Sequence, residues 1–362
     1  MKHIYFIFLT FVTSIVFAQL TPPAELTSYY TAVDFTSTGI SLKNDLIEVT
    51  EDKHTNYLSY GDIWDASRIT DIDPDNSNNV LLLYGYNDTD GNVTSDRTRS
   101  KYDNGGSVGD WNREHVYPKS LGNPNLGTDG PGADAQMLRP SDVQRNGNRG
   151  NLLFADKNSG QFSNGESGST NGGWYPGDEW KGDCARIIMY MYLRYGDRCL
   201  PSNVGYGSSN ATPDDMIDLF LQWNAEDPVV EGGLEDVRNT YHGNTSNTYA
   251  QGNRNPFIDN PYLATVIWGG PEAQNRWSSL SVSDTQKDIV KIFPNPTSGN
   301  EITILSNQVI TAEIYNILGK KIKVQSITPN QSKINISGLT KGVYLIKLNS
   351  ENGIQTKRLI KH

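Results

Sequence analysis

The feature that most constrains the fold is an abrupt change of texture late in the chain. The segment 278–286 (SSLSVSDTQ) is small and polar, which is the composition of a flexible linker. The formal charge also changes, because residues 19–278 carry 19 basic and 36 acidic side chains whereas residues 279–362 carry 11 basic and 5 acidic ones. The sequence therefore predicts two separately folding domains, 19–278 and 291–362, joined by a linker at 279–290.

The N-terminus has the pattern of an export signal. Residues 1–18 begin with a basic Lys2, continue with an apolar run from Ile4 to Phe17 and end on the small residue Ala18. This is typical of a signal peptide, and the run is too short to span a bilayer comfortably. We expect residues 1–18 to be removed on export, and we expect no stable membrane span.

The chain has two cysteines, Cys184 and Cys199. Export favours a disulfide between them. However, if 184–195 is a straight helix, its ends lie about 16 Å apart. The four residues that follow would then have to turn straight back to reach the roughly 5.5 Å Cα separation of a bridge. The sequence leaves the pairing open.

The longer domain is predicted to be α+β and mainly helical. Its segment Cys184–Tyr195 is apolar nearly all round and stops at Gly196, which is typical of a buried helix. The run Thr212-Pro213-Asp214-Asp215 has a capping hydroxyl, a proline and two acids in order, which predicts a helix start. Hydrophobic periodicity further predicts helices at 42–49 and 233–241 and a buried strand at 79–84.

The C-terminal domain is predicted to be a β-sandwich of about seventy residues, because its apolar residues alternate in short runs. Asn352-Gly353 is a hairpin signal before a last strand that ends near 358–360. The other strands are expected at 301–305, 311–315, 333–336 and 343–348.

The chemistry of the chain is concentrated between Trp111 and Asn151, where Glu114, His115 and Asn146 occur. Hydrolysis of a phosphodiester needs a base for water and positive charge at the phosphorus. The imidazole of His115 suits the base, because its pKa lies near neutral pH, although a lone histidine is more often structural. Glu114 and Asn146 offer hard oxygen ligands for Mg²⁺, with Mn²⁺ or Ca²⁺ as alternatives.

Neighbours on a regular strand face opposite sides, so Glu114 and His115 share a site only at a strand end or a bulge. Pro118 makes a strand end credible there. We expect a second strand at 133–138 and a short helix that starts at 140–142 and carries Asn146 about one turn in.

Several cations accompany this stretch and can hold phosphate despite the acidic background, which itself argues against a nucleic-acid substrate. The individual alternative for each cation is a solvated basic face. We predict that Arg139 and Arg149 act in catalysis and that the substrate is bound by Arg113, Lys119 and Arg145.

The run WNREHVYPKSLGNPNLGTDGPGADA, followed by LRPSD and NGNRGN, closely resembles the bacterial endonuclease I family of ββα-metal (His-Me finger) nucleases. The likeness extends over most of 40–270. It implies that His115 is the general base, that Glu114 and Asn146 bind the metal, and that the products carry 5′-phosphate and 3′-hydroxyl ends. The family's usual histidine-containing pair before LRP is Gln136-Met137 here.

The tail resembles the C-terminal sorting domain of type IX secretion, through KIFPNPTSG, NILGKKI, GLTKGVYLI and the basic end KRLIKH. This implies passage across an outer membrane by that machinery and a secreted or cell-surface location. The alternative for this domain is a carbohydrate-binding sandwich.

We therefore expect a monomeric, secreted endonuclease that cleaves DNA and possibly RNA with little sequence specificity. The main alternative is a surface adhesin or glycan-binding module on a nuclease-like scaffold. A phosphodiesterase for small substrates is a second alternative.

Overall fold

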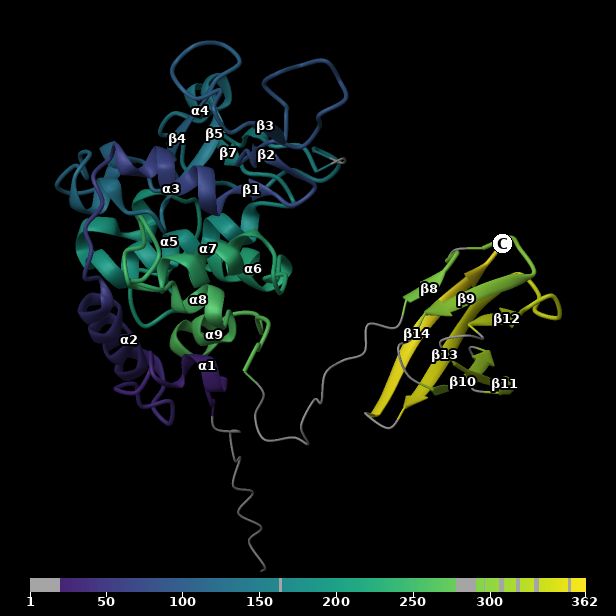
Figure 1. Cartoon of the computed structure of the whole chain (residues 1–362). Coiled ribbons are helices and arrows are strands. Elements are labelled where there is room, and N and C mark those ends of the chain that lie inside the picture. Colours follow the sequence, from purple (N-terminus) through teal and green to yellow (C-terminus); the bar gives the residue numbers. More distant parts are fainter. Residues whose placement is uncertain are drawn as a thin grey trace, which may run out of the picture. The chain divides into compact units, whose positions relative to one another are not determined.

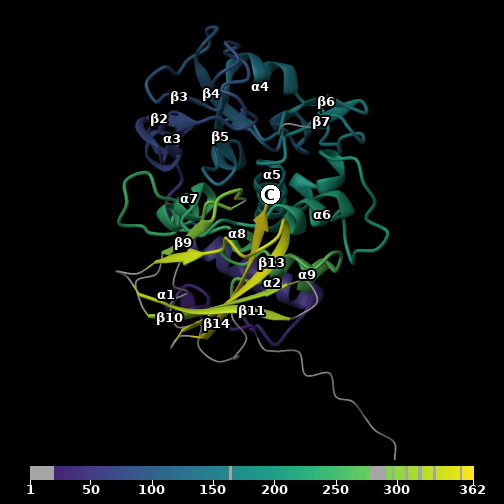
Figure 2. The same cartoon turned by 90° about the vertical axis from the view of Figure 1, so that its right-hand side faces the viewer.

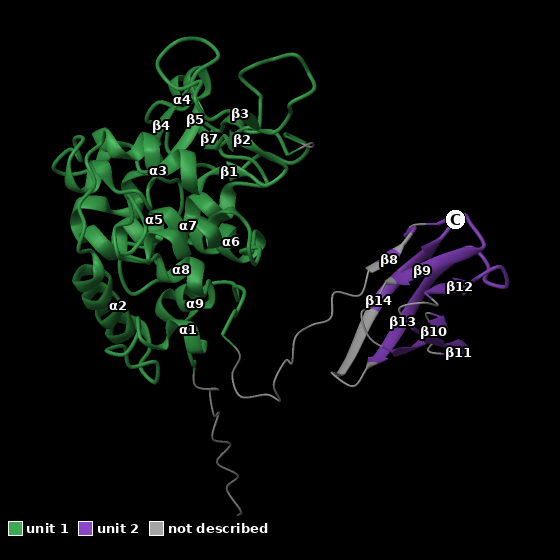
Figure 3. Cartoon of the chain, in the orientation of Figure 1, with its two compact units in different colours: residues 1–279 green, residues 280–362 purple. Residues whose placement is uncertain are grey.

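The computed structural model describes residues 20–162, 165–277, 291–295, 297–305, 309–316, 320–328, 332–350 and 353–362. The expected signal peptide (1–18), the linker (279–290) and Asn352 of the hairpin signal lie outside these residues. The chain divides into two compact units, residues 1–279 and 280–362 (Figure 3).

Helices dominate the first unit, as the sequence predicts. Its α-helices in the described residues are α1 (Ala24–Thr27), α2 (Gly39–Lys53), α3 (Asp62–Thr70), α4 (Val143–Arg149), α5 (Lys181–Tyr195), α6 (Asp218–Glu226), α7 (Leu234–His242), α8 (Pro256–Asp259) and α9 (Tyr262–Trp268). Short 3₁₀ helices lie at η1 (Lys119–Leu121), η2 (Gly130–Ala133), η3 (Gly196–Cys199) and η4 (Pro201–Asn203).

The strands of the first unit are short and antiparallel. They form one three-stranded sheet, β1 (Ile72–Asp73), β2 (Asn76–Leu81) and β3 (Thr98–Ser100), and two hairpin-like pairs, β4 (Trp111–His115) with β5 (Leu138–Asp142) and β6 (Gly168–Thr170) with β7 (Gly173–Tyr175).

Helix α5 is the centre of the first unit. Twelve of its fifteen residues are buried, and it ends at Gly196, whose φ of 53° is the left-handed conformation that glycine accepts without strain. Figures 1 and 2 place α5 in the middle, with β4, β5 and α4 at one end of the unit and α1, α2 and α9 at the other. The predicted buried helix is confirmed.

Both cysteines are free and buried, Cys184 inside α5 and Cys199 in η3. The pairing that the sequence left open is therefore absent between these two residues.

The predicted helix start at 212–215 is wrong, because α6 begins at Asp218. The hydroxyl of Thr212 does not cap a helix but donates to the carbonyl of Met216 (2.7 Å). Asp214 pairs with Lys43 (2.5 Å) and Asp215 accepts from the backbone of Ser202 (3.0 Å). Tertiary contacts therefore use the acids that the local pattern assigns to a helix N-terminus.

Two strand predictions also need correction. The strand expected at 79–84 spans Asn76–Leu81, after which the chain turns. The strand expected at 133–138 is β5 at Leu138–Asp142, and the helix expected to start at 140–142 starts at Val143. The segment 130–133 is a 3₁₀ helix instead.

The described residues of the second unit form two antiparallel sheets, and their buried apolar side chains form one cluster. The expected strands are present, and the sequence patterns missed β8 and β11. One sheet has the order β11 (Lys321–Ile327), β10 (Ile310–Asn316), β13 (Gly342–Ser350) and β14 (Gly353–Lys361), and the other β12 (Lys333–Asn335), β9 (Glu301–Leu305) and β8 (Lys291–Phe293).

Within the described residues, no helix is both long and apolar enough to cross a membrane.

The buried imidazole of His242 predicts a dependence of stability on pH. Burial, aided by the charge of Arg238, lowers the pKa of His242 to about 3, whereas an unfolded histidine titrates near 6.5. Between these two pKa values His242 is protonated in the unfolded state but neutral in the folded state. The free energy of unfolding therefore falls as the pH drops below about 6.5.

We expect His242→Gln not to show this fall in the free energy of unfolding. The difference in unfolding free energy between the wild type and this variant should therefore decrease by roughly 1.4 kcal/mol per pH unit below about 6. Urea unfolding at pH 7, 6 and 5 measures this difference. A difference that stays constant over this range would contradict the assignment.

Candidate active site

The candidate site is built on the β4–β5 pair and on helix α4, which follows β5 directly. In the register of the two strands Glu114 lies opposite Arg139. The carboxylate of Asp142 accepts from the backbone N–H of Arg145 (2.9 Å) at the N-terminus of α4, and it also pairs with Arg99 (2.6 Å). This cap fixes where the helix begins and therefore which of its residues face β4.

Glu114 and Asn146 lie in the same interface between β4 and α4. Alternate residues of a strand share a face, so Asn112 and Glu114 point the same way, and residues three apart share a face of a helix. The amide nitrogen of Asn146 donates to Oδ1 of Asn112 (2.7 Å), and the guanidinium of Arg149 lies 3.4 Å from Oε1 of Glu114. The structure thus brings the two predicted metal ligands to one side of the hairpin.

Glu114 is a buried carboxyl group with 2% of its surface exposed. Burial raises its pKa to about 7, against the opposing effects of Arg149 and of the hydroxyl of Tyr84, which donates to Oε1 (2.9 Å). The negative charge of Glu114 is therefore only partly compensated by the protein.

Tyr84 has a left-handed backbone with φ of 72°, which is costly for a tyrosine. Its carbonyl oxygen accepts from Ser167 Oγ (2.7 Å) and from Arg145 Nε (3.2 Å), and these bonds hold it in place. Tyr84 was not predicted as a site residue, because the apolar run around it indicates only a buried strand.

His115 occupies the opposite face of β4, at the last residue of the strand. Its ring stacks on Tyr60 with centroids 5.5 Å apart, and its Nε2 donates to the carbonyl oxygen of Gly132 (3.0 Å). A carbonyl oxygen only accepts, so the proton of the neutral ring sits on Nε2 and the basic lone pair is on Nδ1. Burial lowers the pKa of His115 to about 4, so the ring is neutral at pH 7.

The carbonyl of Gly132 is held in place by a buried polar network around Asp134. Oδ2 of Asp134 accepts from the hydroxyls of Tyr190 and Tyr195 (2.7 Å each), and its Oδ1 accepts from Gln251 Nε2 (3.1 Å). The network ties the segment that orients His115 to the central helix α5.

Arg139, predicted to act in catalysis, is instead part of the folded core. It is 1% exposed, and its guanidinium binds Asp71 (2.9 Å) and Asp183 (3.0 Å). Arg238 binds the second oxygen of the same Asp71. A guanidinium enclosed by two carboxylates has no access to a phosphate, so the structure corrects this assignment.

Arg149 is fully buried as well and binds protein groups rather than solvent. It donates to the backbone carbonyls of His115 (3.2 Å) and Val116 (2.8 Å), in addition to its contact with Glu114. Its place is to hold the end of β4, not to contact a substrate.

The three predicted substrate ligands differ in access. Arg145 is buried, and its guanidinium donates to Tyr84 and Ser167, so it supports the site from within. Arg113 is half-buried and its guanidinium lies 3.5 Å from the ring centroid of Tyr60, while Lys119 is exposed in η1. Arg113 and Lys119 are the two that remain placed for a substrate.

Among the described residues, no group of three or more histidine, cysteine or acidic side chains is placed to hold a metal ion. The donors here are the carboxylate of Glu114 and the amide oxygen of Asn146. Asn146 uses its nitrogen to bind Asn112, so its oxygen is the atom left for a cation. A partly compensated buried carboxylate beside an amide oxygen fits a hard divalent ion.

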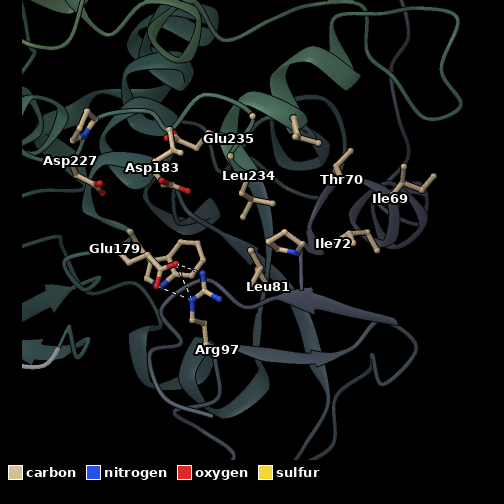
Figure 4. Close-up of a pocket in the computed structure, with 17 residues that line it drawn as sticks. Ile69, Thr70, Ile72, Leu81, Arg97, Glu179, Asp183, Asp227, Leu234 and Glu235 are labelled. Atoms are coloured by element: carbon tan, nitrogen blue, oxygen red, sulfur yellow. Dashed lines mark hydrogen bonds and ion pairs between the residues drawn. The ribbon is translucent and has the colours of Figure 1, made fainter. Parts of the chain in front are cut away.

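A separate cavity of about 370 Å³ lies between the end of α3, the start of α5 and α7. Figure 4 shows its acidic lining, Asp183, Asp227 and Glu235, and the ion pair of Arg97 with Glu179. None of the predicted site residues lines it.

Comparison with known proteins assigns the class. The sequence profile of Endonuclease I matches residues 38–262, and that of the secretion system C-terminal sorting domain matches residues 291–362. The chain is therefore a secreted nuclease, extracellular or attached to the cell surface. It belongs to the Endonuclease I family.

Curated relatives agree with this class. The chain is 40% identical over 262 residues to the extracellular ribonuclease of Bacillus amyloliquefaciens, covering 69% of this chain and 81% of that protein. It is equally similar to the extracellular ribonuclease of Bacillus subtilis (strain 168), with 82% of that protein covered. It is also 29% identical over 75 residues to beta-agarase A of Zobellia galactanivorans, covering 20% of this chain and 14% of that protein.

The network around Asp134 gives a testable expectation. Asp134→Asn removes an acceptor for the two tyrosine hydroxyls, which loosens the segment that holds His115. We expect kcat for nucleic-acid hydrolysis to fall by about 10- to 100-fold, the usual cost of removing a supporting contact, with a smaller change in KM.

The matched control is Asp178→Asn, a half-exposed carboxylate that binds Lys157 and Tyr175 away from this network. Wild-type kcat in Asp134→Asn would show that the network does not orient His115.

Proposed function

We propose that the protein hydrolyses phosphodiester bonds of RNA and DNA with one divalent cation, Mg²⁺ before Mn²⁺ or Ca²⁺, and with His115 as general base. The observation that carries this proposal is the β4–β5–α4 arrangement. It places Glu114 and Asn146 together on one face and a neutral His115 at the strand end beside them. This is the arrangement expected of a ββα-metal nuclease.

His115 removes the proton from the attacking water. Its Nε2 is committed to Gly132, so Nδ1 accepts the proton, and the carbonyl of Gly132 stabilises the imidazolium that results. The ring needs no prior deprotonation at neutral pH, because burial keeps it neutral.

Glu114 and Asn146 would hold the cation. When bound, the cation supplies positive charge to the phosphate oxygens and to the departing oxygen. Tyr84 and Arg149 fix the carboxylate of Glu114, and Asn112 fixes the amide of Asn146, so both ligands are oriented in advance.

Arg113 and Lys119 bind substrate phosphates, in place of the enclosed Arg139. The printed names of the two Bacillus relatives, extracellular ribonucleases, support RNA as a substrate. The family resemblance supports cleavage of DNA with little sequence specificity and products that carry 5′-phosphate ends.

The second unit serves as an address for type IX secretion rather than as part of the nuclease. Its two sheets around one core fit a β-sandwich, and its positive charge contrasts with the acidic first unit. We propose that the protein acts outside the cell as a monomer.

The first test removes the base. We expect His115→Ala to lower kcat by about 10²- to 10⁴-fold, because that is the contribution of general base catalysis, while the circular dichroism spectrum stays that of the wild type. His362→Ala is the matched control, since it removes an exposed imidazole at the other end of the chain. A His115→Ala variant with wild-type turnover would exclude His115 as the base.

The second test removes the cation. We expect EDTA to abolish cleavage of both RNA and plasmid DNA, and Mg²⁺ to restore it. Because Asn146 supplies one of two protein ligands, Asn146→Ala is expected to raise the half-saturating Mg²⁺ concentration by about tenfold or more. End-labelling after phosphatase treatment identifies the product ends.

Cleavage that persists in EDTA would contradict the metal assignment. Specific glycan binding without hydrolysis of any nucleic acid would favour an adhesin on this scaffold instead.

A further inference from the structure

A row of aromatic and cationic side chains extends from the candidate site along α3. We call it the aromatic track. It is formed by Tyr57, Tyr60, Trp64, Arg68, Tyr102 and Arg113. Helix α3 packs against β5, and it lies beside the β4–β5 pair in both views of the chain (Figures 1 and 2).

The middle of the track lies against the imidazole of His115. His115 stacks on Tyr60 at 5.5 Å, and the guanidinium of Arg113 lies 3.5 Å from Tyr60 and 4.0 Å from Trp64. Arg68 follows Trp64 by four residues, which is about one helical turn or 6 Å along α3. Its guanidinium lies 5.6 Å from the ring of Tyr102.

Both ends of the track expose an aromatic ring. Tyr57 is 65% exposed and stacks one face on His54 at 4.5 Å and an interplanar angle of 16°, while Tyr102 is 71% exposed. Tyr57 is three residues from Tyr60, so the Cα atoms of the two tyrosines lie within about 10 Å of each other. Exposed rings held in place by neighbours are stacking platforms without an occupant from this chain.

The position of Tyr57 is set by the active-site scaffold. The ring of His54 beneath it is buried, which lowers the pKa of His54, and the charge of Asp134 opposes that effect. Asn253 bridges His54 to the hydroxyl of Tyr190 in the network around Asp134. The platform and His115 are thus held by the same group of buried residues.

Unpaired positive charge accompanies the track. Among the described residues, no carboxylate forms an ion pair with Arg113, Lys101 or Lys119, whereas Arg68 is paired with Asp65 (2.5 Å). Nε of Arg113 is buried without a hydrogen-bond partner. In an acidic unit whose other arginines are mostly paired, these three cations lack a carboxylate partner within the described part of the chain and lie near the rings of the track or near His115.

We infer that the aromatic track binds single-stranded nucleic acid, with bases stacked on Tyr57 and Tyr102 and phosphates held by Arg113, Lys101 and Lys119. This rests on the proposed function and names its substrate class. Stacking on a protein ring needs a base whose face is free, and a duplex keeps its base faces inside the helix. Alternating rings and cations suit a strand that presents bases and phosphates in turn.

The experiment uses the full chain with a single-stranded oligonucleotide and a stable hairpin duplex that contains the same sequence. We expect Tyr57→Ala and Tyr102→Ala each to raise KM for the single strand by about tenfold, which is the scale of one base stacked on one ring, with little change in kcat. The hairpin is expected to be a poorer substrate and to be insensitive to both variants.

Two controls separate stacking from other effects. Tyr206→Ala is the matched control, because Tyr206 is 50% exposed in the same unit but contacts the turn at Gly172 and Gly173 instead. Tyr57→Phe keeps the ring and is expected to retain wild-type KM. Equal effects of Tyr57→Ala and Tyr206→Ala, or equal KM values for strand and hairpin, would overturn the inference.

A binding measurement keeps the inference separate from the proposed function. Fluorescence anisotropy with His115→Ala in EDTA gives the dissociation constant for the single strand without turnover. Three phosphate contacts predict a slope of about −2 for log K against log salt concentration. If Tyr57→Ala loses binding but the wild type hydrolyses no nucleic acid, the aromatic track is supported and the nuclease mechanism is refuted. If the wild type hydrolyses nucleic acid but neither tyrosine variant changes binding or KM, the aromatic track is refuted and the nuclease mechanism stands.

Discussion

The buried guanidinium of Arg149 is the contact on which the site depends. It binds the carboxylate of Glu114 and the backbone carbonyls of His115 and Val116, so one side chain of α4 fixes the strand end that carries both reactive residues. The same helix presents Asn146 one turn earlier. Removal of this cation would leave Glu114 buried without its ion pair, which costs about 3–5 kcal/mol in comparable cases. The positions of the proposed base and of the proposed cation ligands are therefore set by a single buried charge and its acceptors.

The strand end also resolves a geometric conflict between two adjacent reactive residues. Glu114 faces α4 and Tyr84, whereas His115 faces Tyr60 and Gly132, as alternation along a strand requires. β4 stops at His115, so the ring can reach round the end of the strand from the opposite face. The environments differ accordingly: Glu114 is a carboxyl whose pKa is raised to about 7, and His115 an imidazole whose pKa is lowered to about 4. Such opposed shifts are typical of functional sites.

The sequence predicts features that depend on neighbouring residues, but it does not predict contacts with residues that are distant in the chain. Helix α5 and its stop at Gly196 follow from local pattern. That Glu114 and Asn146 lie close together could also be predicted, because they belong to the consecutive elements β4, β5 and α4. The sequence predicts a catalytic role for Arg139 and a helix start at Asp214, but these residues pair with Asp71 and Lys43, which are 68 and 171 residues away. No local signal reveals that a charge is enclosed.

The distribution of charge within the first unit explains how an acidic protein handles a polyanion. Some of its carboxylates compensate buried arginines such as Arg139, Arg186 and Arg238, each of which has an acidic partner, while the unit as a whole keeps a large negative charge. Long-range attraction to nucleic acid is consequently weak, and it is screened further over about 8 Å at physiological salt. Under the proposed function, affinity comes from short-range contacts: the proposed cation, a few lysines and arginines without ion pairs, and stacking. A nuclease built in this way loses less binding to salt than a basic one, which suits work outside the cell.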